Sequence, residues 1–406
     1  MKIVLHIASH MGGGVGKVLS NLALSDTEYH HHIILLEKPI DTCFTEKLNS
    51  ASLTIAPSID LLKNMIRNTD IVQWDWWWHP LLAKMMHEMK DIPVRSVIWS
   101  HTVGCHYPYI CPEFVSLPQR FIFSSYYSRQ NPHWTLNDIY HMNCTSVVNS
   151  SGGFESTENV PLQDHSGFNV GYIGTLGYMK LLPQFVQYCQ AISDIPGIRF
   201  IMIGRIPEPN QILQDARVAG IADKFVFKGY VDDLPSELAK LDVVGYLLNP
   251  HHHGTTENAL LEAMSMGVTP VCINQCAEKY LIKNGVTGYL VNSKQEYATV
   301  MGKLYQDKKE RLLIGRAAKS HITTVLSLDS TISRLHRVYD SLMQYQKVPM
   351  DFDRVFGSTP YEWYLNGCPP DDNEFSKYLT DATKGSVAQW AKYFPEDKDL
   401  AAMVKK

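Results

Sequence analysis

Short apolar runs that alternate with helical stretches constrain the fold of this chain most, because the alternation occurs twice. In the first half the apolar runs are residues 3–8, 32–36, 71–74, 94–99 and 121–124. The pattern restarts with runs at 169–173, 200–203, 225–227, 243–247 and 269–273. Strands that alternate with helices form parallel βαβ units covered on both faces. The sequence therefore predicts an α/β protein with two doubly wound, Rossmann-like domains.

The segment between the two series, residues 149–166, is rich in Ser, Gly, Asn and Pro and lacks periodicity, which is typical of a linker. We therefore expect an N-terminal domain over residues 1–160 and a second domain over 161–348. After residue 349 the chain becomes aromatic and rich in Pro and Gly, and a helical stretch follows at 374–393. Residues 349–406 are predicted to form a C-terminal helical appendage, with packing back on the first domain as one arrangement.

The composition is that of a folded protein with no strong charge bias. Hydrophobic residues make up 45% of the 406 positions, and the formal net charge is −4. This balance gives no general attraction to nucleic acid, and no nucleic-acid partner is expected. No apolar run approaches the roughly 18 residues of a membrane span, and the N-terminal run stops at glycines, as a first strand would. With scattered cysteines that match no usual zinc spacing, these features predict a cytoplasmic protein.

A glycine-rich loop follows the first predicted strand and opens a helix at Gly12, Gly13 and Gly14. Exposed backbone amides at a helix start favour anions. The loop fails as an ATP-binding P-loop, because Met11 and Val18 occupy the positions of an obligatory Gly and Ser/Thr. The dinucleotide fingerprint cannot be placed on it either. We expect it to bind an anionic ligand; the alternative is a tight turn without a ligand.

Two carboxylates distinguish residues 250–274. Glu257 is expected in the first turn of a helix capped by Thr255 or Thr256, where the helix dipole favours a negative charge. Glu262 follows within an otherwise apolar stretch. A carboxylate in apolar surroundings needs a partner, and the two hydroxyls of a ribose would serve. The alternative for Glu262 is a solvated helix face.

Five segments occur in the order GGGVGKVLSNLA, GYIGTLGYMK, FIMIGRIPE, FKGYVDDL and GTTENALLEAMSMGVTPV. This ordered set, which covers roughly residues 1–300, resembles the retaining glycosyltransferases of the GT-B fold, and in particular the large family numbered four. The resemblance implies two Rossmann-like domains facing a central cleft. It also implies a nucleotide-diphosphate sugar as donor substrate.

The resemblance assigns the donor phosphates and ribose to individual residues. Glu262, in the segment Glu-Ala-Met, matches the glutamate that holds the donor ribose. Lys180 matches a lysine that neutralises the diphosphate, whereas Thr175 replaces the family's arginine after Gly174. Arg205, just after the next strand, is our candidate for restoring that charge, because a guanidinium binds phosphate through two donors.

Other positions concern the nucleobase and the transferred sugar. Tyr230 and Val231 lie in a segment that the resemblance places near the nucleobase. The family's first glutamate falls at Gly254, which has no side chain, so Glu257 or His253 is expected to substitute. For Glu257, simple stabilisation of the helix dipole is the alternative.

In the first domain, His101 follows a strand where the family often places a histidine that faces the donor sugar; a polar loop residue is the alternative. The run QWDWWWHP at 73–80 also ends a strand and offers aromatic surface of the kind that stacks on sugars. An aromatic core is the alternative, although three consecutive tryptophans cannot all face one core.

These features together predict a retaining glycosyltransferase that acts on a glycan or lipid-linked acceptor in bacterial surface polysaccharide synthesis. The catalytic candidates are His101, Lys180 and Glu257. The donor-binding candidates are Gly12, Gly13, Gly14, Gly174, Thr175, Lys180, Arg205, Tyr230, Val231, His253, Asn258 and Glu262. Protein charges and the helix start at Asn258 would stabilise the leaving diphosphate, so no metal or cofactor is expected.

Two alternatives remain at this stage. One is a GT-B-shaped nucleotide-sugar epimerase, and the other is a non-catalytic sugar-binding protein, suggested by Gly254 and Thr175. Peripheral association with the inner face of a membrane is a further option for the location.

Overall fold

The computed structural model describes residues 1–406 except 40, 136, 139–144, 370–384 and 405–406. The chain forms two compact units. The first unit contains Met1–Gly152, His253–Thr255 and Leu328–Lys406, and the second contains Gly153–His252 and Thr256–Ser327.

The first unit is built on a parallel sheet. Within the described residues the sheet has seven strands in the order β3-β2-β1-β4-β5-β6-β7. The strands are β1 (Lys2–Ala8), β2 (Tyr29–Leu35), β3 (Leu53–Ile55), β4 (Ile71–Trp76), β5 (Ser96–Ser100), β6 (Arg120–Phe123) and β7 (Thr145–Val147). The helices are α1 (Gly13–Ser25), α2 (Ile59–Asn68), α3 (Pro80–Met89), α4 (Pro112–Val115), α14 (Leu328–Leu342), α15 (Phe352–Phe356), α16 (Pro360–Asn366), α17 (Val387–Tyr393) and α18 (Lys398–Val404).

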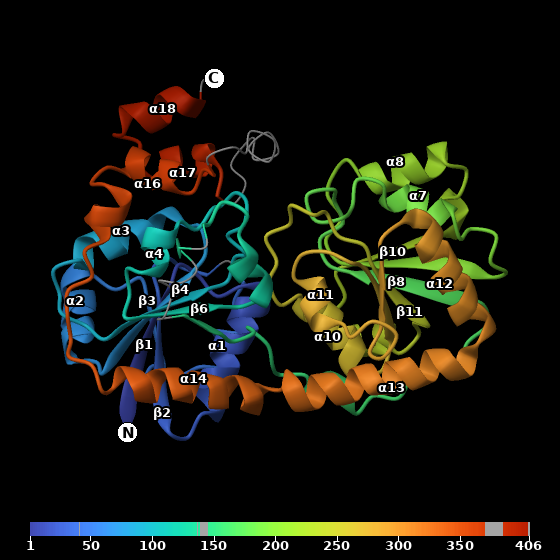
Figure 1. Cartoon of the computed structure of the whole chain (residues 1–406), viewed down its shortest axis with the longest axis horizontal. Coiled ribbons are helices and arrows are strands. Elements are labelled where there is room, and N and C mark those ends of the chain that lie inside the picture. Colours follow the sequence, from blue (N-terminus) through green and yellow to red (C-terminus); the bar gives the residue numbers. More distant parts are fainter. Residues whose placement is uncertain (40, 136, 139–144, 370–384, 405–406) are drawn as a thin grey trace. The chain divides into compact units, whose positions relative to one another are not determined.

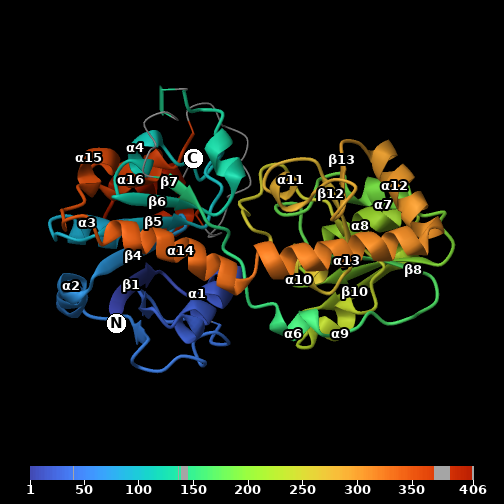
Figure 2. The same ribbon diagram turned by 60° about the horizontal axis from the view of Figure 1, so that its bottom comes forward.

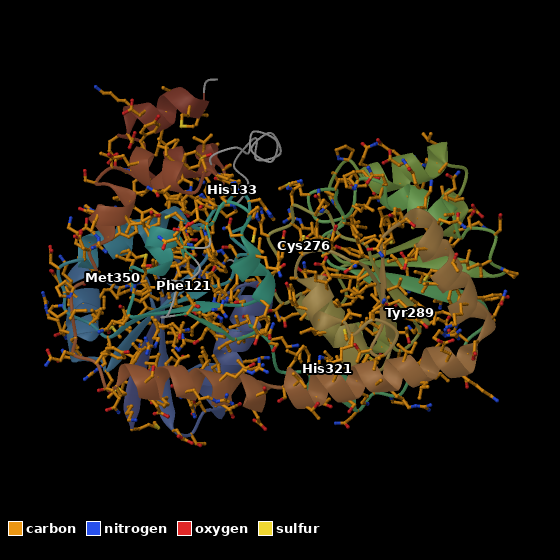
Figure 3. The ribbon with its side chains drawn as sticks, viewed as in Figure 1. Phe121, His133, Cys276, Tyr289, His321 and Met350 are labelled. Carbon is orange, nitrogen blue, oxygen red and sulfur yellow. The ribbon has the colours of Figure 1, made fainter. Side chains whose placement is uncertain are left out.

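Helices cover both faces of this sheet, so its strands are apolar on both sides, as expected for a parallel sheet. One core contains Leu19 of α1 and Leu335 of α14. The other contains Phe121 of β6, which Figure 3 labels, together with residues of α3 and of the C-terminal helices. Figure 1 shows α16 and α17 beside α3.

The second unit repeats this architecture. Within its described residues a six-stranded sheet has the order β10-β9-β8-β11-β12-β13. The strands are β8 (Phe168–Ile173), β9 (Ile198–Ile203), β10 (Phe225–Gly229), β11 (Val243–Tyr246), β12 (Thr269–Ile273) and β13 (Tyr289–Val291). The helices are α6 (Glu155–Glu158), α7 (Phe185–Gln190), α8 (Gln211–Val218), α9 (Leu234–Leu238), α10 (Asn258–Ser265), α11 (Glu278–Leu281), α12 (Lys294–Gln306) and α13 (Lys308–Val325). Figure 2 shows α13 running beside α10 in this unit.

The prediction of two Rossmann-like, doubly wound domains is confirmed, because both sheets are parallel and helices cover them. The short edge strands β3, β7 and β13 were not predicted. Each has only three residues, too few to show a hydrophobic period.

The division of the chain differs in detail from the predicted one. Residues 328–348 were assigned to the second domain, but α14 packs with the first unit, where Leu335 and Tyr339 are completely buried. Residues 349–406 also belong to the first unit. The predicted helix at 374–393 falls partly outside the described residues; its described end is α17. Among the described helices, none has the length and apolar character needed to cross a membrane.

Candidate functional site

Open parallel sheets bind ligands at the carboxyl ends of the strands, beside the point where the strand order reverses. In the second unit that point lies between β8 and β11, and in the first unit between β1 and β4. The candidate residues fall in the loops that follow these and neighbouring strands. They are Gly12–Gly14 after β1, His101 after β5, Gly174, Thr175 and Lys180 after β8, Arg205 after β9, Tyr230 and Val231 after β10, and Glu257 after β11.

An ion pair between Lys180 and Glu257 forms the centre of the arrangement in the second unit. The Lys180 Nζ lies 2.7 Å from each carboxylate oxygen of Glu257. The hydroxyl of Tyr246 also donates to Glu257 Oε2, at 2.7 Å. Burial alone would raise the pKa of Glu257, but the charges of Lys180 and His252 and these hydrogen bonds hold it at about 2. Glu257 is therefore an ionised carboxylate although its residue is only 7% exposed.

Further polar residues extend this pair into the unit. His252 Nδ1 lies 3.4 Å from Glu257 Oε1, and His252 Nε2 lies 3.2 Å from an oxygen of the buried Glu278. Sequence reasoning missed His252, Glu278 and Tyr246. The run of three histidines at 251–253 was the only signal for His252, and nothing marked Glu278, which follows β12.

Glu257 has an unusual backbone conformation. Its φ of 49° and ψ of 58° are left-handed, a region that costs a residue with a side chain roughly 1–2 kcal/mol. Glu257 is the N-cap of α10 and its side chain caps no helical amide. We expected Thr255 or Thr256 to cap this helix and Glu257 to lie in its first turn. This expectation is wrong, because the cap lies one or two residues later, at Glu257 itself. The turn directs the Glu257 carboxylate toward Lys180.

Glycines allow the loops after β8 and β9 to approach each other closely. A Cβ on Gly204 would lie 2.0 Å from the carbonyl oxygen of Gly174, and the φ of Gly204 is +132°. The amide of Leu176 donates to the carbonyl of Arg205 at 3.0 Å, which joins the two loops. Thr175 and the Arg205 side chain are exposed near this junction.

The other donor candidates lie near the same edge of the sheet. Tyr230 follows β10 and is 81% exposed, with Val231 half-buried beside it in the chain. Asn258 is the first residue of α10, and Glu262 lies about one turn further along, half-buried. The ribose-binding role of Glu262 stays a prediction.

In the first unit, the glycine loop forms the start of α1, which begins at Gly13. Gly16 has a packing role, because a Cβ there would lie 2.9 Å from the ring of Phe44 and 3.0 Å from the backbone of Met11. Gly12 to Gly14 are at least partly accessible at the helix start.

The tryptophan run divides between core and pocket. Trp76 and Trp78 are 2% and 6% exposed and belong to the core around α3. Trp77, between them, is half-buried and lines a pocket of about 200 Å³ with His79 and His101. Both alternatives for this run, an aromatic core and an accessible aromatic surface, therefore apply: Trp76 lies in the core, Trp77 faces the pocket, and the buried Trp78 also lines the pocket.

His101 is held firmly in that pocket. Its amide donates to the carbonyl of Trp76 at 2.8 Å, and its Nε2 lies 3.1 Å from Asp75 Oδ1. His101 Nδ1 is buried and has no hydrogen-bond partner among the described residues. His253, which was predicted to bind the donor in place of the glutamate absent at Gly254, is grouped with the first unit and also lines this pocket.

Among the described residues, no group of three or more His, Cys, Asp or Glu side chains has a geometry that could hold a metal ion.

Residues 167–307 match the family Glycosyl transferases group 1. Two curated proteins are similar to a shorter segment. A 2-deoxystreptamine N-acetyl-D-glucosaminyltransferase of Streptomyces fradiae is 36% identical over 107 residues, which are 25% of this chain and 24% of that protein. A 2-deoxystreptamine glucosyltransferase of Streptomyces kanamyceticus is 30% identical over 113 residues, 27% of this chain and 28% of its own. The matched segments thus span about a quarter of these relatives.

Solved structures resemble this chain over most of its length. The Anabaena protein HepE in complex with UDP superposes with a TM-score of 0.66 at 16% identity, covering 84% of this chain and all of that one. Sucrose-phosphate synthase from Thermosynechococcus elongatus gives a TM-score of 0.65 at 12% identity, over 84% and 99% of the two chains. At these identities the likeness establishes the fold, which is that of the GT-B proteins.

Proposed function

We propose that this chain transfers a sugar from a nucleotide-diphosphate donor to a hydroxylated acceptor with retention of anomeric configuration, because residues 167–307 match the group 1 glycosyltransferases. The observation that carries the proposal is the Lys180–Glu257 pair beside the switch point of the second sheet. It places a fixed ammonium group where open α/β sheets bind ligands.

The donor side of the proposal rests on how positive charge is arranged. An ammonium has three donors, and Glu257 accepts two of those of Lys180. The third is available to an oxygen of the donor diphosphate. Glu257 fixes Lys180 in position. The family's own glutamate cannot take part, because Gly254 replaces it in this chain. Arg205, exposed at the neighbouring strand end, would supply a second cation to the leaving diphosphate.

For the remaining donor-binding residues we propose the roles that the sequence predicts. Glu262 would accept hydrogen bonds from the ribose, and Tyr230 and Val231 would contact the nucleobase. The amides of Gly12–Gly14 and the helix start at Asn258 would bind phosphate oxygens. UDP is the nucleotide named for the similar HepE structure, and we propose a UDP-sugar as the first donor to test.

For the acceptor we propose a saccharide, free or lipid-linked, in the synthesis of a bacterial surface polysaccharide. The names of the two curated relatives describe transfer to 2-deoxystreptamine, a polyhydroxylated ring. The first-unit pocket would suit such a ring, because Trp77 offers it an aromatic surface. We place the protein in the cytoplasm, with peripheral membrane association if the acceptor is lipid-linked.

Incubation with a panel of nucleotide sugars, with and without saccharide acceptors, tests this proposal. We expect nucleoside diphosphate release that depends on both substrates, with a glycosylated product. Release or isomerisation of the donor sugar without an acceptor would instead identify an epimerase or hydrolase. The absence of donor binding in a thermal-shift screen of the same panel would exclude a nucleotide-sugar enzyme.

A further inference from the structure

A row of hydrogen bonds crosses the sheet of the first unit beneath His101. Asp75 Oδ2 lies 2.9 Å from His6 Nδ1, and His6 Nε2 lies 2.7 Å from His31 Nδ1. The row continues from His31 Nε2 to Asp26 Oδ2, at 2.9 Å. His31, His6 and Asp75 belong to the adjacent strands β2, β1 and β4, and His101 follows β5. All four of these residues are buried.

Counting protons shows that this row contains a positive charge. Carboxylates only accept hydrogen bonds, so the three contacts between Asp75 and Asp26 require three N–H protons. Two neutral imidazoles carry two. The pair of His6 and His31 therefore holds one additional proton, which makes one of them an imidazolium.

Burial lowers the pKa of His31 to about 4, so His31 is neutral near pH 7. His6 Nδ1 faces the Asp75 carboxylate and must carry a proton. A buried charge requires a partner of opposite sign, and Asp75 supplies it. Gln73 Nε2 also donates to Asp75 Oδ1, at 2.9 Å, and its own oxygen accepts from the hydroxyl of Tyr339 at 2.7 Å.

This arrangement determines the protonation of His101. Its Nε2 faces the Asp75 carboxylate at 3.1 Å and must carry a proton. A doubly protonated His101 would also carry a proton on Nδ1, which has no acceptor among the described residues. A neutral His101 with a proton on Nε2 has a bare Nδ1. That nitrogen is buried without a described partner, in the ring that lines the pocket with Trp77 and His79.

We propose that Asp75 is a positioning residue that holds His101 with Nε2 protonated and thereby presents Nδ1 as a hydrogen-bond acceptor for a hydroxyl of the sugar substrate. His6 keeps Asp75 ionised from the opposite side. A polyhydroxylated ring is the class of ligand that such an acceptor, next to an indole face, would recognise. The inference deepens the proposed function and rests on it for the identity of the ligand.

The protonation state can be measured without any substrate. In protein labelled with ¹⁵N-histidine, the His101 signals are assigned by comparison with His101→Gln. We expect a proton on Nε2 and none on Nδ1 in the parent protein. Asp75→Leu removes the carboxylate that faces Nε2, so the fraction of His101 with its proton on Nδ1 should rise. Asp353→Leu is the matched control, because Asp353 contacts His87 at 2.6 Å in the same unit but outside the pocket; it should leave the His101 signals unchanged.

A kinetic measurement then tests the link to catalysis. With a donor and acceptor that support transfer, Asp75→Leu should lower kcat/KM about 10- to 100-fold, the loss expected for one hydrogen bond of this kind, while Asp353→Leu should not. A proton on Nδ1 of the parent, or an unchanged tautomer in Asp75→Leu, would overturn the assignment. The parent measurement decides the matter even if Asp75→Leu does not fold. If no donor supports transfer, the proposed function fails while the tautomer result stands.

Discussion

The Nζ of Lys180 lies within 2.7 Å of both carboxylate oxygens of Glu257, and the two residues reach this contact from loops after different strands. Seventy-seven positions separate them in the chain. The left-handed backbone of Glu257 permits the contact at a cost in strain, which the ion pair and the Tyr246 hydrogen bond offset. Backbone strain of this kind is usually retained at functional sites.

The buried carboxylate of Glu257 should contribute a pH-dependent stability. Its pKa is lowered from 4.5 to about 2 on folding, so the contribution is full above pH 4.5 and disappears as the pH falls through 2. The shift corresponds to at most about 3 kcal/mol. We expect the difference in free energy of unfolding between the parent and Glu257→Gln to decrease over this window, measured by denaturant unfolding. A difference that does not vary with pH would show that Glu257 is not ionised in the folded protein.

Removing Lys180 should destabilise the second unit and weaken donor binding. Lys180→Met leaves the Glu257 carboxylate buried without its cation, a change that typically costs about 3–5 kcal/mol. The double variant Lys180→Met/Glu257→Gln should recover much of this stability, because neither charge remains. It should not recover binding of the nucleoside diphosphate. Thermal unfolding and calorimetric titration of the double variant separate the two roles, and full recovery of binding would exclude Lys180 as a phosphate ligand.

Much of the fold could be predicted from the sequence, because strands such as β1 and β8 are mostly apolar runs followed by loops that contain glycine. Lys180, in the loop after β8, was singled out only because it matches a lysine of the family that the sequence resembles. The contact between Lys180 and Glu257 could not be predicted, because it depends on the left-handed turn at Glu257, a conformation that glycine or asparagine would have signalled. The participation of Tyr246 follows only from the spatial neighbourhood of β8 and β11.

The hydrogen-bond network beneath His101 could not be predicted from the sequence either. His6 and His31 occupy strand positions and resemble ordinary polar interruptions of apolar runs, and only the strand order β2-β1-β4 brings them to Asp75. The helix α14 was assigned to the wrong unit, because its amphipathic pattern shows that one face is buried but not against which sheet.

Glu262 should matter for nucleotides that contain ribose. Charge-assisted hydrogen bonds to ribose hydroxyls are worth about 1.5–3 kcal/mol, so Glu262→Gln should weaken nucleoside diphosphate binding by about one to two orders of magnitude. A free nucleobase should bind the parent and variant equally. Glu396→Gln, an exposed carboxylate of the first unit, serves as the control. Unchanged nucleotide affinity in a folded Glu262→Gln protein would identify Glu262 as a structural residue.

Transfer should survive removal of divalent metal ions. Lys180 and Arg205 are proposed to balance the charge that develops on the leaving diphosphate, a role that metal ions fill in other enzymes. We expect the rate with excess EDTA to equal the rate with added magnesium or manganese, measured as nucleoside diphosphate release. Complete loss of activity that either metal restores would contradict this assignment of the leaving-group chemistry.

The most direct test of the account is an NMR time course of the complete reaction, with an active nucleotide sugar and its acceptor. The anomeric proton of the first product reports both transfer and stereochemistry. The account predicts a new glycosidic bond with the same anomeric configuration as the donor, formed as nucleoside diphosphate accumulates. A product of opposite configuration, or conversion of the donor without a new glycosidic bond, would contradict retaining glycosyl transfer.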